Sequence, residues 1–64
     1  MVVKTSFGKI SASKETLNYI FLMMGEASKN YELRGYFALS NEAQKNANAI
    51  YDALDLVGFY DNVK

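Results

Sequence analysis

The stretch Leu33–Val57, LRGYFALSNEAQKNANAIYDALDLV, decides the fold class, because its apolar residues recur at the spacing of one helical face. From residue 41 onward it is also rich in Ala, Glu, Gln, Lys and Leu, which favour helix. The apolar stripe consists of Leu33, Tyr36, Phe37, Ser40, Ala43, Ala47, Ile50, Tyr51, Leu54 and Val57. We therefore predict a helix over about 41–57.

The two ends of this stretch differ in how clearly they are marked. Gly58 is predicted to cap the helix, with Phe59 packing back on the last turn. Upstream, residues 26–39 fit a helix at period 3.6 and a strand at period 2; we favour the helix, because the stripe stays in phase past Ser40. Ser40-Asn41-Glu42 is also a capping signal, which predicts a separate helix over about 28–39.

A further helix is predicted over about 14–24. Ser13 can cap its first turn, and Glu15 complements the helix dipole. Apolar side chains lie on nearly all sides of this helix, so we expect it to be central or to form an interface. Gly25 is predicted to end it.

The first eleven residues read as an extended arm or strand, because they are rich in Val, Thr, Phe and Ile. An isolated strand needs a partner, and no partner strand is obvious, so we expect pairing with a second copy if the strand forms. The whole chain, 1–64, is predicted to be one mostly α domain: this segment, then a helical hairpin or a three-helix mini-bundle (14–24, 28–39, 41–57), present as a dimer.

The expectation of a homodimer comes from size and composition. A chain of 64 residues buries a limited core, half of its residues are hydrophobic, and it has no cysteine for a disulfide. The predicted dimer interface consists of Ile20, Phe21, Met23, Met24 and Phe37. Asn46 lies beside the stripe and is expected to be exposed, with a buried polar register position as the alternative.

Composition and spacing argue against catalytic, metal and cofactor sites. The chain has neither cysteine nor histidine, which removes the usual nucleophile–base pairs and zinc sites. Its four glycines are isolated, so no phosphate-binding loop can be drawn. Asp52 and Asp55 share a helix face, but two carboxylates without a third ligand make a weak metal site. We therefore predict no enzyme and no cofactor.

Charge is distributed unevenly although the net charge is zero. All charged residues within 1–14 are lysines, and all charged residues within 46–63 are aspartates. An acidic end interleaved with aromatic residues suits a basic protein partner. The predicted partner-binding residues are Tyr51, Asp52, Asp55, Phe59, Tyr60 and Asp61.

These observations predict a small protein–protein interaction or regulatory module, of the kind that bacterial phages or plasmids encode as accessory proteins. No stretch is apolar enough to span a membrane, and the lack of cysteine points to the cytoplasm. The alternative is a dimeric DNA-binding regulator, because a basic strand followed by helices has the outline of a ribbon-helix-helix protein. Lys4, Ser6 and Gly8 would then face outward. Zero net charge does not favour nucleic acid as the partner.

Overall fold

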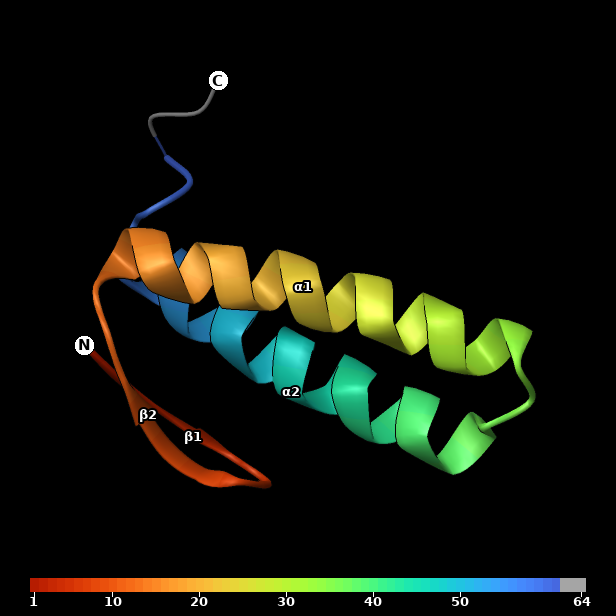
Figure 1. The fold of residues 1–64 in the computed structure, drawn as a ribbon. Coiled ribbons are helices and arrows are strands. Elements are labelled where there is room, and N and C mark those ends of the chain that lie inside the picture. The colour runs from red at the N-terminus through yellow and green to blue at the C-terminus, as the bar shows by residue number, and fades with distance from the viewer. Residues whose placement is uncertain (62–64) are drawn as a thin grey trace.

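A computed structural model describes residues 1–61 as a β-hairpin followed by two antiparallel helices (Figure 1). The strands are β1 (Val2–Thr5) and β2 (Gly8–Ser11), and the helices are α1 (Lys14–Leu33) and α2 (Phe37–Leu56). The predicted order of an N-terminal β segment and a mostly helical remainder is confirmed. Of the two predicted helical arrangements, the helical hairpin is confirmed and the three-helix mini-bundle is wrong.

Helix α1 begins as the sequence predicts and ends later than predicted. The Ser13 hydroxyl oxygen accepts a hydrogen bond from the backbone N–H of Thr16 at 3.2 Å, and Glu15 lies in the first turn. The helix then continues through Gly25, so the predicted end there is wrong. A glycine inside a helix costs only about 1 kcal/mol, which the packing of the flanking residues Leu17 and Ser28 against α2 offsets.

Both helices end in the same glycine motif. At the end of α1 the N–H of Gly35 donates to Glu32 O, and the N–H of Tyr36 donates to Tyr31 O at 2.9 Å. At the end of α2, Gly58 and Phe59 donate in the same pattern. Gly35 and Gly58 adopt φ values of 82° and 75°, which side chains disfavour. The predicted cap at Gly58 is confirmed. Gly35 ends α1 at a point where the apolar stripe predicted that the helix would continue.

Ser40 lies inside α2 rather than at its start, so the predicted cap at Ser40-Asn41-Glu42 is wrong. Its hydroxyl donates to Ser28 O at 2.8 Å, and the Ser28 hydroxyl donates to Ser40 O at 2.9 Å. Both serines are buried between the helices. Because each hydroxyl has a partner on the facing helix, Ser40 is free to occupy a helical position and need not cap one.

The N-terminal segment finds its strand partner within the chain. Strands β1 and β2 pair antiparallel through a two-residue turn, Ser6-Phe7, with Thr5 opposite Gly8. Gly8 has φ 107°, a conformation that favours glycine. The Thr5 hydroxyl donates to Gly8 O and accepts from the N–H of Phe7, which holds the turn closed. The expectation of a lone strand pairing only with a second copy is therefore wrong.

The core lies where the hairpin meets the two helices. Its buried apolar side chains are Val3, Leu17, Ala47, Ile50 and Leu54. The later part of the predicted stripe is thus buried, but its beginning is not: Leu33 is 79% exposed, and Tyr36 and Phe37 are more than half exposed. Gly35 turns the chain at this point, which removes the first stripe residues from the helix face that α1 contacts.

Candidate functional site

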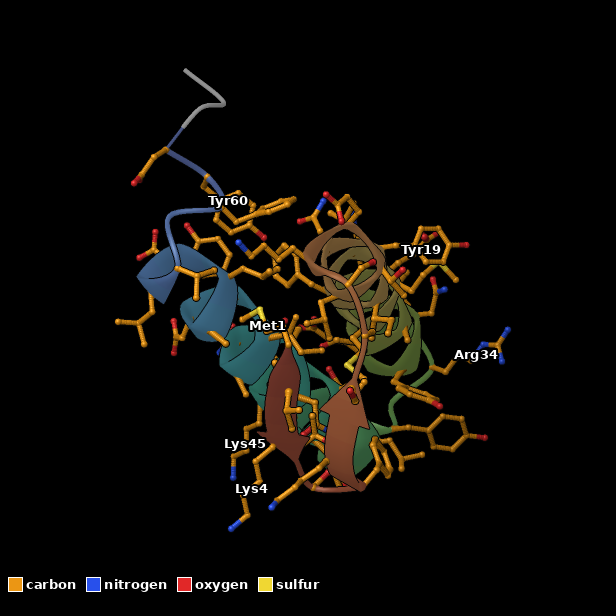
Figure 2. The ribbon with its side chains drawn as sticks, turned by 90° about the vertical axis from the view of Figure 1, so that its left-hand side faces the viewer. Met1, Lys4, Tyr19, Arg34, Lys45 and Tyr60 are labelled. Atoms are coloured by element: carbon orange, nitrogen blue, oxygen red, sulfur yellow. The ribbon has the colours of Figure 1, made fainter. Side chains whose placement is uncertain are left out.

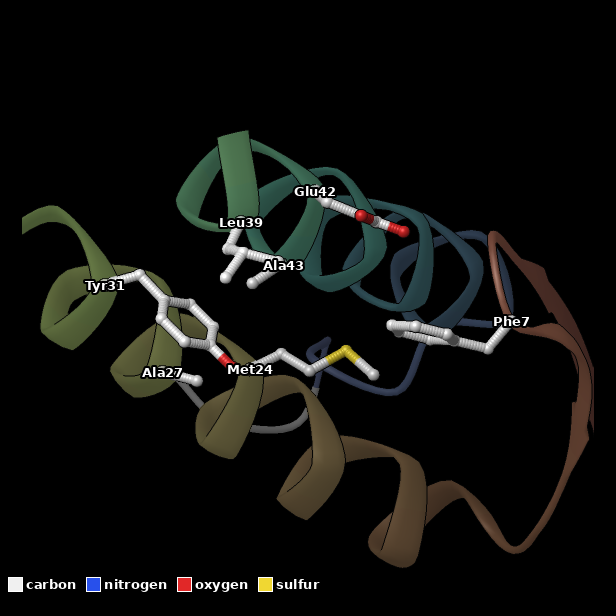
Figure 3. Close-up of a pocket in the computed structure, with 7 residues that line it drawn as sticks. All are labelled: Phe7, Met24, Ala27, Tyr31, Leu39, Glu42 and Ala43. Carbon is white, nitrogen blue, oxygen red and sulfur yellow. The ribbon is translucent and has the colours of Figure 1, made fainter. Parts of the chain in front are cut away.

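A pocket of about 320 Å³ opens between the hairpin turn and the half of the helical hairpin nearest the α1–α2 connection. Figure 3 shows Tyr31 at one end of the pocket and Phe7 at the other, with Met24 between them. Its lining residues are Phe7 from the turn, Met24, Ala27 and Tyr31 from α1, and Leu39, Glu42 and Ala43 from α2. Most of this lining is apolar, so the pocket suits an apolar side chain.

The pocket depends on Asn46, which fixes the hairpin turn on α2. The Asn46 side-chain carbonyl accepts from the N–H of Ser6 at 3.0 Å, and its amide donates to the Ser6 hydroxyl at 2.8 Å. That hydroxyl in turn donates to Glu42 at 3.0 Å. Asn46 is 3% exposed, so the expectation that it is exposed is wrong and the buried alternative holds. This clamp places Phe7 at the mouth of the pocket.

Phe7 is 75% exposed although it is aromatic. Phe7 lies in the hairpin turn and lines the pocket, yet most of its ring remains in contact with water. Leu39, across the pocket, is also 48% exposed. Two large apolar side chains that face a shared hollow are a typical feature of a protein-binding surface.

Glu42 supplies the carboxylate of the pocket lining, and the Tyr31 hydroxyl is the other titratable group there. A basic residue beside the apolar group of a ligand could therefore pair with Glu42. Among residues 1–61, no three His, Cys, Asp or Glu side chains gather in a way that could hold a metal ion.

The predicted acidic C-terminal site divides into a packed part and an exposed part. Tyr60 stacks on Tyr51 with ring centroids 5.0 Å apart and meets Phe59 edge-on at 5.2 Å. Its hydroxyl donates to the Asn18 side chain at 2.7 Å, which ties the chain after α2 to α1. The three carboxylates of the predicted set remain exposed: Asp52, Asp55 and Asp61.

Burial raises the pKa of the Tyr60 hydroxyl above its ordinary value, and negative charge on Tyr51 and Asp55 raises it further. Tyr51 also contacts Phe21 of α1, with ring centroids 5.4 Å apart. The aromatic members of the predicted site thus contribute to packing within the chain, while its aspartates are exposed.

The predicted dimer-interface residues also separate into two groups. Ile20, Phe21 and Met24 are partly buried against the core of their own chain. Met23 and Phe37 are exposed. Neighbours of Met23 on α1 add to the exposed apolar surface, namely Tyr19 and Leu22.

Of the residues that line the pocket, only Met24 was assigned to a site from the sequence, as part of the predicted dimer interface. Phe7, Tyr31 and Leu39 come from three separate segments, and the placement of the β-hairpin on α2 brings Phe7 to the pocket that the two helices line. One signal was present in the sequence: an aromatic residue between a serine and a glycine in a turn has no apolar neighbour to justify its burial.

Comparison with protein-family models, curated proteins and solved structures finds no match for this chain. Neither helix within residues 1–61 has the length and hydropathy needed to cross a membrane.

Proposed function

We propose that this protein is a non-enzymatic protein-binding module that receives an apolar side chain of its partner in the pocket between the hairpin turn and the helices. The observation that carries the proposal is the exposure of Phe7 and Leu39 on opposite sides of an apolar hollow. Burying such side chains against a partner stabilises a complex by about 25 cal/mol for each Å² removed from water.

A pocket of about 320 Å³ with a mostly apolar lining favours a partner segment that inserts one large anchor residue. Binding surfaces of this kind concentrate most of their affinity in a few aromatic or aliphatic anchors. Glu42 at the pocket favours partners with Lys or Arg close to the anchor.

Affinity capture from the source cell with matched variants tests this function. The pocket variant Phe7→Ser/Leu39→Ser should lose the proteins that wild type captures, with affinity reduced about thirtyfold or more. The control Leu33→Ser/Leu56→Ser removes two exposed leucines outside the pocket, which are 79% and 87% exposed, and should retain them. Equal capture by both variants, or equal loss, contradicts the proposal.

The homodimer expected from the sequence belongs to the same proposal. Tyr19, Leu22 and Met23 recur at the spacing of one helix face and are exposed on α1, which favours association with a second copy. Sedimentation at micromolar concentration tests it. A species near 7.2 kDa at every concentration would show that the chain is a monomer.

A further inference from the structure

The outer face of the β-hairpin carries two lysines directly opposite each other. Lys4 on β1 pairs with Lys9 on β2, and both side chains are exposed. Like charges in opposite cross-strand positions destabilise a sheet. The inner face of the same strands carries the buried residues Val3 and Thr5, so the two lysines point away from the core. Their placement costs stability and offers a partner two adjacent cations.

A third lysine joins this face from α2. Strand β1 packs against α2, and the hydrogen bonds between Ser6 and Asn46 place the residue next to Lys45 against the hairpin. Figure 2 shows Lys4 and Lys45 extending toward the same side of the molecule, below the helix pair in that view. We call Lys4, Lys9 and Lys45 the basic face.

Acidic residues near the C-terminal end lie elsewhere. Tyr60 lies on the opposite side of the helix pair from Lys4 and Lys45 (Figure 2), and Asp55 is close enough to Tyr60 to raise its pKa. Glu42 is the carboxylate bonded to the hairpin, and it lies at the turn, where it accepts from Ser6. Although the net charge is zero, Lys4, Lys9 and Lys45 concentrate positive charge on one side of the hairpin, with Glu42 at its turn, so the basic face can attract an anion locally.

We propose that the basic face binds the phosphate backbone of duplex DNA, with the two-stranded ribbon lying along the major groove. The major groove of B-form DNA is about 12 Å wide and admits a two-stranded β-ribbon. The outward side chains of the ribbon are Val2 and Lys4 on β1 and Lys9 and Ser11 on β2. A lysine contacts phosphate as a point charge, and the Ser11 hydroxyl can donate to a phosphate oxygen.

In the ribbon-helix-helix outline considered from the sequence, each of two chains supplies one strand of the ribbon. Here both strands come from one chain. The basic face also differs from the pocket, which lies between the hairpin turn and the two helices and has none of the three lysines in its lining. The proposal therefore adds a second binding activity to the proposed protein-binding function and does not depend on it. A chain with both would join a partner protein to DNA.

The salt dependence of binding to a labelled DNA duplex of about two helical turns tests the proposal. Each neutralised phosphate contributes about −0.9 to the slope of log affinity against log salt, so three lysines give about −2.7. Affinity should then fall roughly fortyfold between about 50 and 200 mM salt. The variants Lys4→Gln, Lys9→Gln and Lys45→Gln should each reduce the slope by about 0.9.

Lys29→Gln is the matched control, because Lys29 is also an exposed lysine but lies on α1. It should leave both affinity and slope unchanged, and circular dichroism should show that every variant keeps the wild-type helix content. The pocket variant Phe7→Ser/Leu39→Ser should bind DNA as wild type does.

Three outcomes overturn the proposal. The first is no binding at low salt, and the second is a slope that Lys29→Gln reduces as much as Lys4→Gln does. The third is binding of vesicles rich in anionic lipid, or of a duplex RNA of the same length, as tightly as the DNA. The narrow major groove of A-form RNA excludes a ribbon, so equal binding would show nonspecific attraction to any polyanion.

Discussion

Gly25 and Gly35 are both glycines of the α1 region, but the first lies inside the helix and the second ends it. Gly25 lies inside α1 at negative φ, and an added Cβ there would meet nothing within 4 Å. Gly35 ends α1 at φ 82°, where an added Cβ also has space but the backbone conformation disfavours it. Conformation, and not room, therefore decides the effect of a side chain at each position.

We expect Gly25→Ala to raise the free energy of unfolding by about 0.5–1 kcal/mol, because alanine favours helix and restricts the unfolded chain. Gly35→Ala should lower it by about 1–2 kcal/mol, because alanine is strained at positive φ. Urea denaturation of both variants beside wild type measures the two changes. Changes of the same sign would contradict the assignment of Gly25 to a helix interior and Gly35 to its end.

Sequence reasoning at the residue scale succeeded where the signal is local. Ser13 and Gly58 act through hydrogen bonds to residues within five positions, so the surrounding sequence is enough to predict them. The end of α1 at Gly35 was missed for a specific reason: the apolar stripe stays in helical phase on both sides of the turn, which hides the interruption.

At the scale of elements, the contact between the hairpin and α2 depends on one buried amide. Asn46 both accepts from and donates to Ser6, and its own side chain is buried, so the loss of these bonds would leave its amide without partners. Asn48, two residues further along α2, is exposed, and its side-chain carbonyl accepts a hydrogen bond from the side chain of Gln44 on the same helix. The two asparagines form a matched pair for testing the clamp.

Asn46→Ala should lower the free energy of unfolding by about 1–3 kcal/mol, because it leaves the Ser6 N–H without its acceptor. Asn48→Ala should change it by no more than about 0.5 kcal/mol. Chemical denaturation gives both values, and amide exchange at Ser6 should accelerate only in the first variant. If exchange at Ser6 stays slow in Asn46→Ala, the clamp does not hold the turn.

The helices and turns could be predicted from the sequence, but the candidate site could not. Helices and turns depend on neighbours in sequence, whereas the pocket forms only when the turn is attached to a helix 40 positions away. A side chain such as Asn46 beside an apolar stripe fits both an exposed helix position and a buried clamp. The partner of its amide decides between them, and the sequence does not identify that partner.

At the scale of the whole molecule, the hydrogen bond that ties Tyr60, after α2, to Asn18 of α1 makes stability depend on pH. The pKa of Tyr60 is raised above the ordinary value of 10.0, first by burial and then by Tyr51 and Asp55. The folded state therefore favours the protonated hydroxyl, which donates to Asn18. This contribution to stability is complete below pH 10 and is lost as pH rises from 10 through the folded-state pKa.

We expect the free energy of unfolding to fall as the pH rises above 10, and Tyr60→Phe to show a smaller fall than wild type. Tyr19→Phe is the control, because Tyr19 is exposed on α1 and takes no part in this cluster. Thermal or urea denaturation across this pH range, together with tyrosinate absorbance, provides the measurement. An equal fall in Tyr60→Phe and wild type would assign the pH response to other groups.

The separation of 40 positions between Ser6 and Asn46 also has a consequence for the order of folding. The pairs β1–β2 and α1–α2 join neighbours in the chain and close short loops, which is fast, whereas docking the strands on α2 closes a long loop at higher entropic cost. We infer that the β-hairpin and the α1–α2 pair each form first, and that the β-hairpin docks on α2 last. Stopped-flow kinetics of Asn46→Ala should then show faster unfolding and a nearly unchanged refolding rate. Slower refolding would place the docking step before the main barrier.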